Sequence, residues 1–261
     1  MARFCSLFSS SSGNCTYIGC SGGGILIDDG ISAKRTEAAL SSIGVDPASI
    51  SAIFVTHEHT DHIGGVRVFA SRYGTRVFAT NGTLGALNRA GVLNEKFTAS
   101  VIPDGGVQAG GMLVKPFATL HDASESCGYT VTAPDGKKLA VCTDLGRVTG
   151  TVMNAIAGSD LVLLESNHDV NMLRIGPYPY NLKRRIMSEK GHLSNDDCAE
   201  TAVKLLESGT TRFLLGHLSK ENNYPPLAIE TTRAAMKMAG AEENSDYLLS
   251  LAGEGSGLIT L

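Results

Sequence analysis

The residues best suited to chemistry lie together in one short stretch of six, His57-Glu58-His59-Thr60-Asp61-His62. His57 and His59 are two apart on an extended segment, so both side chains point to the same side and can bind one cation. Asp61 and His62 follow where the chain turns into a helix, and their different direction suits a second cation close by. The alternative is a polar surface loop that happens to be rich in histidine.

The segments on either side of this stretch predict a rigid support for it. Residues 50–56 read as a short buried strand rich in β-branched and aromatic side chains. A helix is expected over residues 63–73, where Val66, Phe69 and Ala70 recur at helical spacing. The histidines therefore leave the end of a strand, which is a position that a preorganised metal site needs.

The pattern HxHxDH at a strand end resembles the metallo-β-lactamase superfamily, and other motifs of that family follow in order. They are Asp28 after residues 25–27, with Asp29 as the second choice, His121 in residues 120–122, Asp144 in residues 143–146, and His217 in residues 215–219. The resemblance implies an α/β fold, the αββα sandwich, in one domain over residues 1–261. It also implies the metal ligands: His57, His59 and His121 for one metal, Asp61, His62 and His217 for the other, and Asp144 bridging both.

Each of these motif residues has a structural alternative. His121 and His217 could be hydrogen-bonded structural histidines, and Asp144 could cap the helix expected after Arg147. Two adjacent cations need negative charge between them, which favours Asp144 as a bridging ligand. Asp28 is either a turn residue or a carboxylate that braces a ligating histidine through a hydrogen bond, and we favour the brace.

Composition is consistent with one compact enzyme. The chain has 261 residues and a net charge of −4, which excludes a generally basic nucleic-acid surface but not a local basic patch. Its six cysteines contain no CxxC pair, so we expect reduced thiols. The N-terminus lacks a long apolar signal segment and no run reaches membrane-spanning length, so we expect a cytoplasmic protein that does not bind membranes.

Hydrophobic periodicity predicts two series of alternating strands and helices. The predicted strands cover residues 3–8, 15–19, 24–28, 51–56, 112–117, 126–133, 138–143, 160–165, 211–216, 246–251 and 257–261. The predicted helices cover residues 32–43, 63–73, 81–91, 149–157, 195–208 and 226–239. No repeat, low-complexity linker or domain boundary interrupts them. The loop of residues 9–14 is either an ordinary hairpin loop or part of the site, with Asn14 as a candidate substrate contact.

The substrate must be inferred from other segments, because the same scaffold serves many reactions. His192 precedes the start of the helix over residues 195–208, in an arrangement that resembles the nuclease branch of the superfamily. In nucleases of that branch, the corresponding histidine lies beside the metals and assists the scissile phosphate. His192 could do so by donating a proton to the departing oxygen. His168 is a second candidate at the pocket. Each could instead stabilise a loop, and Asp61 is the third catalytic candidate.

Within that branch the chain is similar to the YycJ/WalJ-type family. The resemblance rests on blocks at residues 4–7, 11–14, 165–169, 176–179, 182–186, 191–195 and 216–223. It implies a 5′→3′ DNA exonuclease linked to repair, and the chain lacks the long insertion of β-CASP nucleases and the extended arm of RNase Z enzymes. Lys183, Arg184 and Arg185 form a basic run that either contacts the nucleic-acid backbone or is a solvated helix face.

The sequence therefore predicts a dinuclear metal-dependent phosphodiesterase that acts on DNA. Zinc, manganese and iron all suit imidazole and carboxylate ligands. The main alternative is a thioester or lactone hydrolase of the glyoxalase II-like type, which has no evident need for the block at residues 191–195. A second alternative is a catalytically weak metal-binding protein that works through a partner, although no protein partner is indicated.

Overall fold

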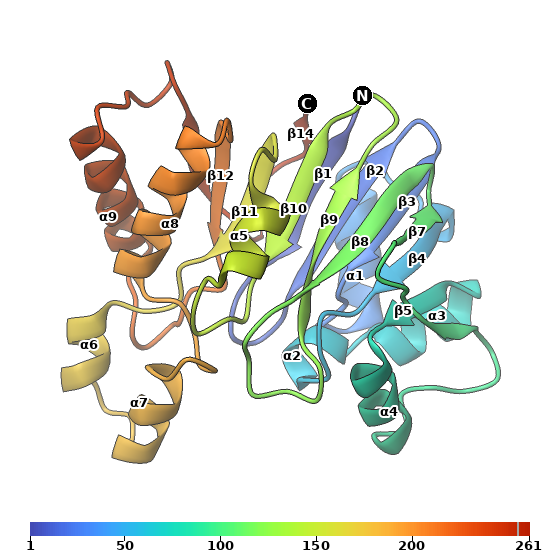
Figure 1. Ribbon diagram of the computed structural model, residues 1–261. Helices are drawn as coiled ribbons and strands as arrows, with labels where there is room; N and C mark the ends of the chain where they lie inside the picture. Colours follow the sequence, from blue (N-terminus) through green and yellow to red (C-terminus); the bar gives the residue numbers. More distant parts are fainter. Residues whose placement is uncertain (255) are drawn as a thin grey trace. The chain divides into compact units, whose positions relative to one another are not determined.

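The chain divides into two compact units in the computed structural model, which describes residues 1–254 and 256–261 (Figure 1). Unit 1 comprises Met1–Phe117, Ala123–Lys137 and Gly253–Leu261, and unit 2 comprises Ala118–Asp122 and Lys138–Ala252. The prediction of a single domain over residues 1–261 stays a prediction. Among the described residues, no helix is both long and apolar enough to cross a membrane.

Unit 1 contains a seven-stranded sheet in the order β14-β1-β2-β3-β4-β5-β6. Its strands are β1 (Arg3–Phe8), β2 (Cys15–Cys20), β3 (Gly23–Ile27), β4 (Ile50–Phe54), β5 (Arg76–Ala79), β6 (Ala99–Val101) and β14 (Ile259–Thr260). The strands from β3 to β6 pair in parallel, and β1 pairs antiparallel with β2 and β14. Both faces of β3 and β4 are covered, which explains why these strands read as nearly continuous apolar runs.

Helices cover one face of this sheet. They are α1 (Ala33–Ser42), α2 (Thr60–Ile63), α3 (Val66–Tyr73) and α4 (Asn81–Arg89), and a 3₁₀ turn spans Pro47–Ser49. Leu40, Phe69 and Leu87 on the helices pack in one buried cluster with Leu26 and Ile53 on the strands. This apolar packing fixes the end of β4, from which the histidine-rich stretch departs.

A second layer of unit 1 consists of β7 (Val107–Ala109), β8 (Met112–Ala118) and β9 (Cys127–Thr132). Strand β9 lies against β4, where the rings of Phe54 and Tyr129 meet edge to face at 5.6 Å. The Tyr129 hydroxyl donates a hydrogen bond of 2.7 Å to the backbone oxygen of Val55. Because Val55 directly follows β4, this contact holds the strand end from the side opposite the helices.

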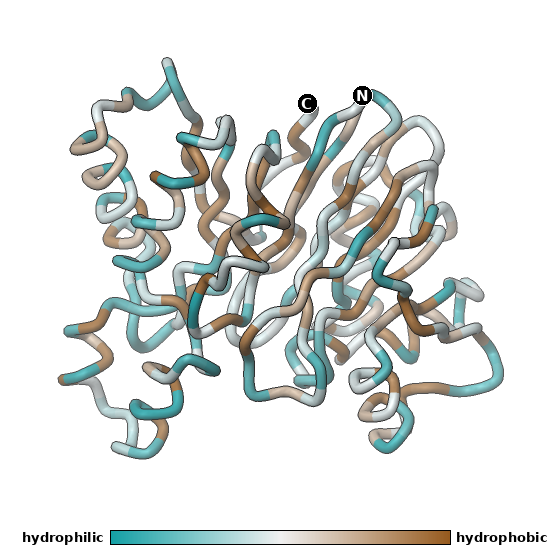
Figure 2. The backbone as a smooth tube through the Cα atoms, in the orientation of Figure 1, coloured by the Kyte–Doolittle hydropathy of each residue, from teal (hydrophilic) through white to brown (hydrophobic). Residues whose placement is uncertain are grey.

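Unit 2 is built on four parallel strands in the order β13-β12-β11-β10. They are β10 (Lys138–Cys142), β11 (Leu161–Glu165), β12 (Arg212–Gly216) and β13 (Leu248–Leu251). The helices are α5 (Gly150–Ile156), α6 (Val170–Ile175), α7 (Tyr180–Ile186), α8 (Asn195–Glu207) and α9 (Pro225–Met238). Helices α8 and α9 pack together, and α9 contacts β13. Figure 2 shows apolar colour concentrated on β10, β11 and β12.

Parallel register brings three polar residues to one edge of unit 2. Cys142 pairs with Leu164, and Glu165 at the end of β11 pairs with Gly216 at the end of β12. Asp144 lies two residues after the end of β10, and His217 directly follows β12. Since parallel strands share their carboxyl edge, this register gathers Asp144, Glu165 and His217.

The predicted elements that carry the motifs are confirmed, and the errors fall on short segments. Strands β5, β6 and β7 were not predicted, because three or four residues hold too little of a period-2 pattern. The predicted helix over residues 63–73 is wrong at its start: α2 ends at Ile63 and α3 begins at Val66, after two glycines. Helices α6 and α7 were missed because prolines and glycine separate two short turns.

Candidate metal centre

In unit 1 the first two histidines leave β4 on an extended segment, as predicted. The Nε2 atom of His57 lies 3.0 Å from Nδ1 of His59, and the two rings meet edge to face. His57 is buried and His59 is partly exposed. The two imidazoles thus present nitrogen atoms to a common point, which is the geometry that a divalent cation requires.

His62 on α2 is oriented by a buried carboxylate. Its Nδ1 lies 2.8 Å from Oδ2 of Asp28, and Thr56 donates to the same carboxylate from its backbone N–H (2.8 Å) and its hydroxyl (2.9 Å). Burial raises the pKa of Asp28, and His62 is the largest influence in the opposite direction. An N–H donated from Nδ1 leaves Nε2 of His62 as the metal-binding atom. Asp28 thus contacts a predicted ligand, and its role as a brace for a metal-bound histidine stays a prediction.

Asn14 places its side-chain amide beside Asp61 and His62. Its Nδ2 lies 3.3 Å from Oδ2 of Asp61 and 3.1 Å from Nε2 of His62. Its Oδ1 accepts a hydrogen bond of 3.1 Å from the backbone of Ser10, which turns the NH₂ group toward the other two side chains. The last side chain of the loop over residues 9–14 therefore contacts two predicted ligands, and the role of Asn14 as a substrate contact stays a prediction.

Glycines let the loops of unit 1 pack backbone against backbone. A Cβ atom on Gly30 would lie 1.6 Å from the backbone oxygen of Asp61. The backbone oxygen of Asn14 accepts from Gly30, and the backbone N–H of Asn14 donates to Asp61, each at 2.8 Å. The motif residues are thus fixed by main-chain hydrogen bonds that no larger residue at position 30 would permit.

In unit 2 the corresponding cluster is organised by Glu165, whose side chain is fully buried. Its Oε1 accepts from Nδ1 of His192 (2.9 Å) and Nδ1 of His217 (2.7 Å). Its Oε2 accepts from the backbone N–H groups of Leu145 and Leu193, each at 3.1 Å. Burial alone would raise the pKa of Glu165, but the two histidines outweigh it and lower the pKa to about 2.

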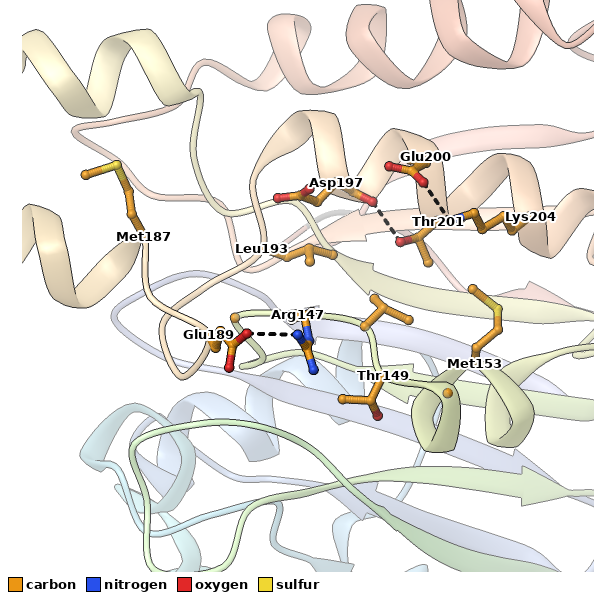
Figure 3. A pocket seen from close by; sticks show the side chains of 13 residues that line it. Arg147, Thr149, Met153, Met187, Glu189, Leu193, Asp197, Glu200, Thr201 and Lys204 are labelled. Carbon is orange, nitrogen blue, oxygen red and sulfur yellow. Dashed lines mark hydrogen bonds and ion pairs between the residues drawn. The ribbon is translucent and has the colours of Figure 1, made fainter.

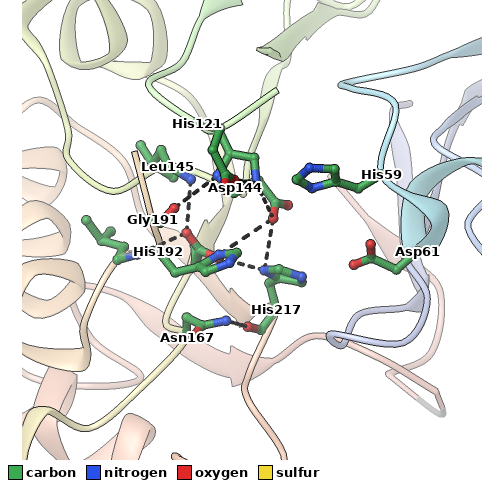
Figure 4. Close-up of polar contacts among 12 residues, drawn as sticks. His59, Asp61, His121, Asp144, Leu145, Asn167, Gly191, His192 and His217 are labelled. Carbon is green, nitrogen blue, oxygen red and sulfur yellow. Dashed lines mark hydrogen bonds and ion pairs between the residues drawn. The ribbon is translucent and has the colours of Figure 1, made fainter. Parts of the chain in front are cut away.

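These contacts determine which nitrogen each imidazole can offer. Because His192 and His217 donate from Nδ1 to Glu165, the Nε2 atom of each is left as the proton donor or metal ligand. Figure 4 shows His121, His192 and His217 around Asp144. Asp144, Glu165, His192 and His217 each offer one ligand atom, and these atoms lie within 4.8 Å of one another. Imidazole and carboxylate donors at that spacing fit a divalent cation.

His121 is fixed by the segment that carries His192. Its Nδ1 lies 3.0 Å from the backbone oxygen of Gly191, and burial lowers the pKa of its imidazole. Asn167 supports the other side of the cluster, since its Nδ2 donates a 2.8 Å hydrogen bond to the backbone oxygen of His217. The first contact constrains the ring of His121, and the second constrains the backbone of His217.

The side chain of His168 is shielded from solvent. Its side chain is buried, and burial lowers the pKa of its imidazole to about 4, so it is neutral near pH 7. Its backbone bridges to Ser194, and its oxygen accepts from Asn195. This environment favours the structural alternative, and the catalytic role predicted for His168 stays a prediction.

The three basic residues in the run on α7 make different contacts. The Lys183 ammonium donates to the backbone oxygens of Arg174 (2.8 Å) and Gly176 (2.7 Å), at the end of α6. Arg185 forms an ion pair with Asp122, next to His121. Arg184 lies over the ring of Tyr180. Lys183 and Arg185 therefore hold the segment in place, and Arg184 is the member best placed to contact a substrate.

A cavity of about 430 Å³ lies behind the segments that carry Asp144 and His192 (Figure 3). Residues 146–150, Met187, Glu189 and Leu193 form part of its wall, together with side chains of α8. Arg147 and Glu189 are ion-paired across the wall at 2.8 Å. Both are well exposed, so this pair adds little stability.

Sequence reasoning assigned no role to Glu165, Thr56 or Asn167. The signal for Glu165 was present, because it ends the apolar run Leu161–Glu165 in the same way that Asp144 follows β10. A single carboxylate inside a strand otherwise free of charge needs partners if it is buried. Thr56 and Asn167 gave no comparable signal, since a hydroxyl or amide after a strand is common.

The comparisons with known proteins agree with this geometry. Residues 24–218 match the model of the beta-lactamase superfamily domain. The chain is 39% identical over 230 residues to exodeoxyribonuclease YycJ of Bacillus anthracis, covering 87% of this chain and 86% of that protein. It is 37% identical over 229 residues to exodeoxyribonuclease WalJ of Streptococcus pneumoniae, covering 87% and 85%.

The fold comparison confirms the predicted α/β class. The metallo-beta-lactamase fold protein YhfI from Bacillus subtilis matches with a TM-score of 0.73 at 12% identity, covering 99% of this chain and 98% of that one. At such low identity the likeness concerns the fold alone. The domain match and the two curated relatives decide the rest: the chain belongs to the beta-lactamase superfamily and, within it, to the group that contains YycJ and WalJ.

Proposed function

We propose that the protein is a metal-dependent exodeoxyribonuclease that removes nucleotides from the 5′ end of DNA. Its relatives YycJ and WalJ are named exodeoxyribonucleases and align with 87% of the chain. The observation that carries the proposal is the hydrogen bond from Nδ1 of His192 to the buried carboxylate of Glu165. A histidine held in this way has a use in phosphodiester cleavage and none that is evident in thioester or lactone hydrolysis.

The metal ligands are proposed from the motifs. His57, His59 and His121 would hold one divalent ion, Asp61, His62 and His217 the other, and Asp144 would bridge them. Zinc, manganese or iron would supply Lewis acidity and an activated water near neutral pH. Asp28 would keep His62 in the tautomer that binds through Nε2, and Glu165 would do the same for His217.

His192 is proposed to assist the leaving group. Its Nδ1 donates to the Oε1 atom of Glu165, so its Nε2 faces away from that carboxylate. When the phosphodiester bond breaks, the departing 3′ oxygen takes a proton from Nε2 of His192, which is general acid catalysis. The backbone contacts of Leu145 and Leu193 to Glu165 keep the pair in place while that proton moves.

Two contacts to the DNA backbone are proposed. The amide NH₂ of Asn14 is directed toward Asp61 and offers a donor to a phosphate oxygen. Arg184 offers an exposed guanidinium. Asp61 is retained as a ligand and catalytic candidate, while a role in DNA repair and a cytoplasmic location stay predictions from the sequence.

The test is a substrate panel with purified protein and added Mn²⁺ or Zn²⁺. The panel contains single-stranded DNA, RNA, a thioester and a lactam, each also assayed after chelation of the metal. The proposal expects metal-dependent DNA degradation that exceeds every other activity. Brisk thioester or lactam hydrolysis with inert DNA would establish an acyl hydrolase, and inertness toward the whole panel with metals bound would favour the catalytically weak alternative.

A further inference from the structure

Residues 66–98 of unit 1 carry an excess of positive charge. They contain five basic residues and one acidic residue, a net charge of +4, while the whole chain carries −4. The basic residues are Arg67, Arg72, Arg76, Arg89 and Lys96, and all five are exposed. The charge of the whole chain excludes a generally basic surface but not a local one, and this segment supplies a local one.

The exposed side of α3 forms one wall of a hollow of about 540 Å³ in this segment. The buried side of α3 consists of Val66, Phe69 and Ala70. Since a helix has 3.6 residues per turn, the pairs of residues between and after them face outward. These pairs are Arg67 with Val68 and Ser71 with Arg72, and all four residues line the hollow. Packing of α3 on its apolar side thus presents two guanidinium groups and a hydroxyl to the hollow.

The opposite wall is the segment after α4, and hydrogen bonds hold it to α3. The Nδ2 atom of Asn94 donates a 2.9 Å hydrogen bond to Oγ of Ser71, and its Oδ1 accepts one of 2.9 Å from the backbone N–H of Lys96. Arg67 donates to the backbone oxygen of Gly91. A guanidinium has five N–H donors, so this bond leaves others for a ligand. The two walls are therefore fixed relative to each other.

The cations of the hollow differ in what already neutralises them. Arg72 is ion-paired with Glu37 on α1. The Lys96 ammonium has no hydrogen-bond or ion-pair partner in the part of the chain that the structure describes. Glu95 is an exposed carboxylate in the same wall and opposes the binding of an anion. Arg67 and Lys96 are therefore the two cations best placed to contact an anionic ligand.

The hollow lies a short distance along the chain from two predicted metal ligands. Arg67 follows His62 by five residues, and α3 follows α2 after two glycines (Figure 1). The turn is fixed, because the Gly65 N–H donates to the Asp29 oxygen (2.7 Å) and the Asp29 N–H donates to the His62 oxygen (3.1 Å). Five residues span at most about 18 Å. That length corresponds to about five steps of a DNA strand.

We propose that Arg67, Ser71, Asn94 and Lys96 form a binding surface, here called the α3 patch, for DNA phosphates a few nucleotides from the scissile bond. The inference rests on the proposed exonuclease function and adds a second anchoring surface to it. Arginine, lysine, hydroxyl and amide donors are the groups that contact phosphate oxygens in protein–DNA complexes. Such contacts carry no base information, so the α3 patch should strengthen binding to DNA of any sequence.

The first test measures binding of a closed circular duplex by the metal-loaded protein, because this DNA offers phosphates but no end to degrade. Lys96→Ala should raise Kd about fivefold, the effect of losing one exposed ion pair, and should reduce the salt slope of log Kd by about 0.9. Arg67→Ala should act in the same direction. Glu95→Gln should lower Kd, because it removes a carboxylate that repels phosphate. A purely structural role of this segment would not give tighter binding.

The second test compares steady-state kinetics on linear duplex DNA. Lys96→Ala should raise KM by the same factor as Kd and leave kcat unchanged, as expected when a contact is equal in the ground and transition states. Hydrolysis of bis(p-nitrophenyl) phosphate should also be unchanged, because that small diester does not reach the α3 patch. Lys237→Ala is the matched control, since Lys237 is an exposed basic residue in the last turn of α9, and it should leave Kd and KM unchanged.

The two tests separate the α3 patch from the proposed function. Unchanged Kd and salt slope in both Lys96→Ala and Arg67→Ala would overturn the α3 patch and leave the exonuclease proposal standing. An equal loss on the small diester would show that the substitutions disturb the metal centre, and would overturn the patch as well. A wild type that binds the circle but cleaves no linear DNA would overturn the proposed function, and with it the place of the patch in DNA degradation.

Discussion

At the scale of single residues, the strand ends of both units share an unusual backbone conformation. Asp28, Asp144 and His217 have φ values of 60°, 58° and 54°, and among the described non-glycine residues only Asn244 joins them. The left-handed region costs an L residue on the order of 1 kcal/mol. It lets the chain turn sharply at a strand end so that the side chain projects past the sheet edge. Strain concentrated at predicted site residues supports a functional role for these strand ends.

Asp144→Asn should remove the bridging charge while keeping a residue that tolerates a positive φ. We expect the variant to lose at least one equivalent of metal and nearly all hydrolysis of DNA, measured by elemental analysis and initial rates. Asn244→Asp is the matched control, because it exchanges the same two residue types at another left-handed position. Full two-metal occupancy with normal turnover in Asp144→Asn would contradict the assignment of Asp144 as the bridging ligand.

His192→Ala should keep its metals and lose roughly 10²–10⁴-fold in kcat on DNA, the usual range for removing a general acid. In the proposed mechanism Glu165 acts through its hydrogen bonds to His192 and His217, so Glu165→Gln should shift the pH profile of kcat as well as lower it. Metal content measured beside the rate separates the roles. If metal occupancy falls with activity in His192→Ala, this histidine is a ligand, as its proximity to Asp144 would permit.

Protonation of the Asp29 carboxyl makes the stability of the metal-free protein depend on pH. Burial raises its pKa from 3.8 to about 7, while Thr36 opposes the rise by donating a hydrogen bond to it. Between those pH values the folded state holds a proton that the unfolded state has released, so stability falls as pH rises and levels off above pH 7. Across this pH range the titration of Asp29 lowers the free energy of unfolding by up to about 4 kcal/mol.

Asp29→Asn removes that titration. Urea unfolding at pH 5 and pH 8, with chelator present, should show a smaller loss of stability in Asp29→Asn than in the wild type. The comparison between the two proteins cancels the other titrating groups. An identical loss in both would show that Asp29 is ionised throughout.

At the scale of elements, the site depends on how closely loops approach one another. The strands that carry the motifs were predictable, because buried parallel strands read as apolar runs that end in a polar residue. The clustering of Glu165 with Asp144 and His217 was not, because it requires the register of three parallel strands. Helices α6 and α7 were also missed, because two short segments leave no clear periodic pattern.

Gly30→Ala should be severely destabilising. Its Cβ would lie 1.6 Å from the backbone oxygen of Asp61, and neither backbone segment can move without breaking the hydrogen bonds to Asn14. We expect a loss of several kcal/mol in unfolding free energy together with weaker metal binding. Gly150→Ala is the matched control, because a Cβ at Gly150 meets nothing within 4 Å. Equal stability of the two variants would show that the Gly30 contact relaxes freely.

At the scale of the whole molecule, the cysteines agree with the reduced thiols expected from the sequence. All six are free and buried, as expected for reduced thiols without a metal-binding pair. Burial raises the pKa of Cys127 and of Cys198 to about 12, so each is a neutral thiol near pH 7. The protein should therefore react slowly with a thiol reagent when folded and release six equivalents once unfolded. A fast-reacting thiol in the folded protein would contradict this burial.

The measurement that tests the central claim most directly compares linear and covalently closed single-stranded DNA of one sequence, in the presence of Mn²⁺ or Zn²⁺. The linear strand carries a label at its 5′ end in one reaction and at its 3′ end in another. A 5′→3′ exodeoxyribonuclease should release the 5′ label in short products at the earliest time points, release the 3′ label last, and leave the circle intact. Cleavage of the circle as fast as the linear strand, or early release of the 3′ label, would contradict the account.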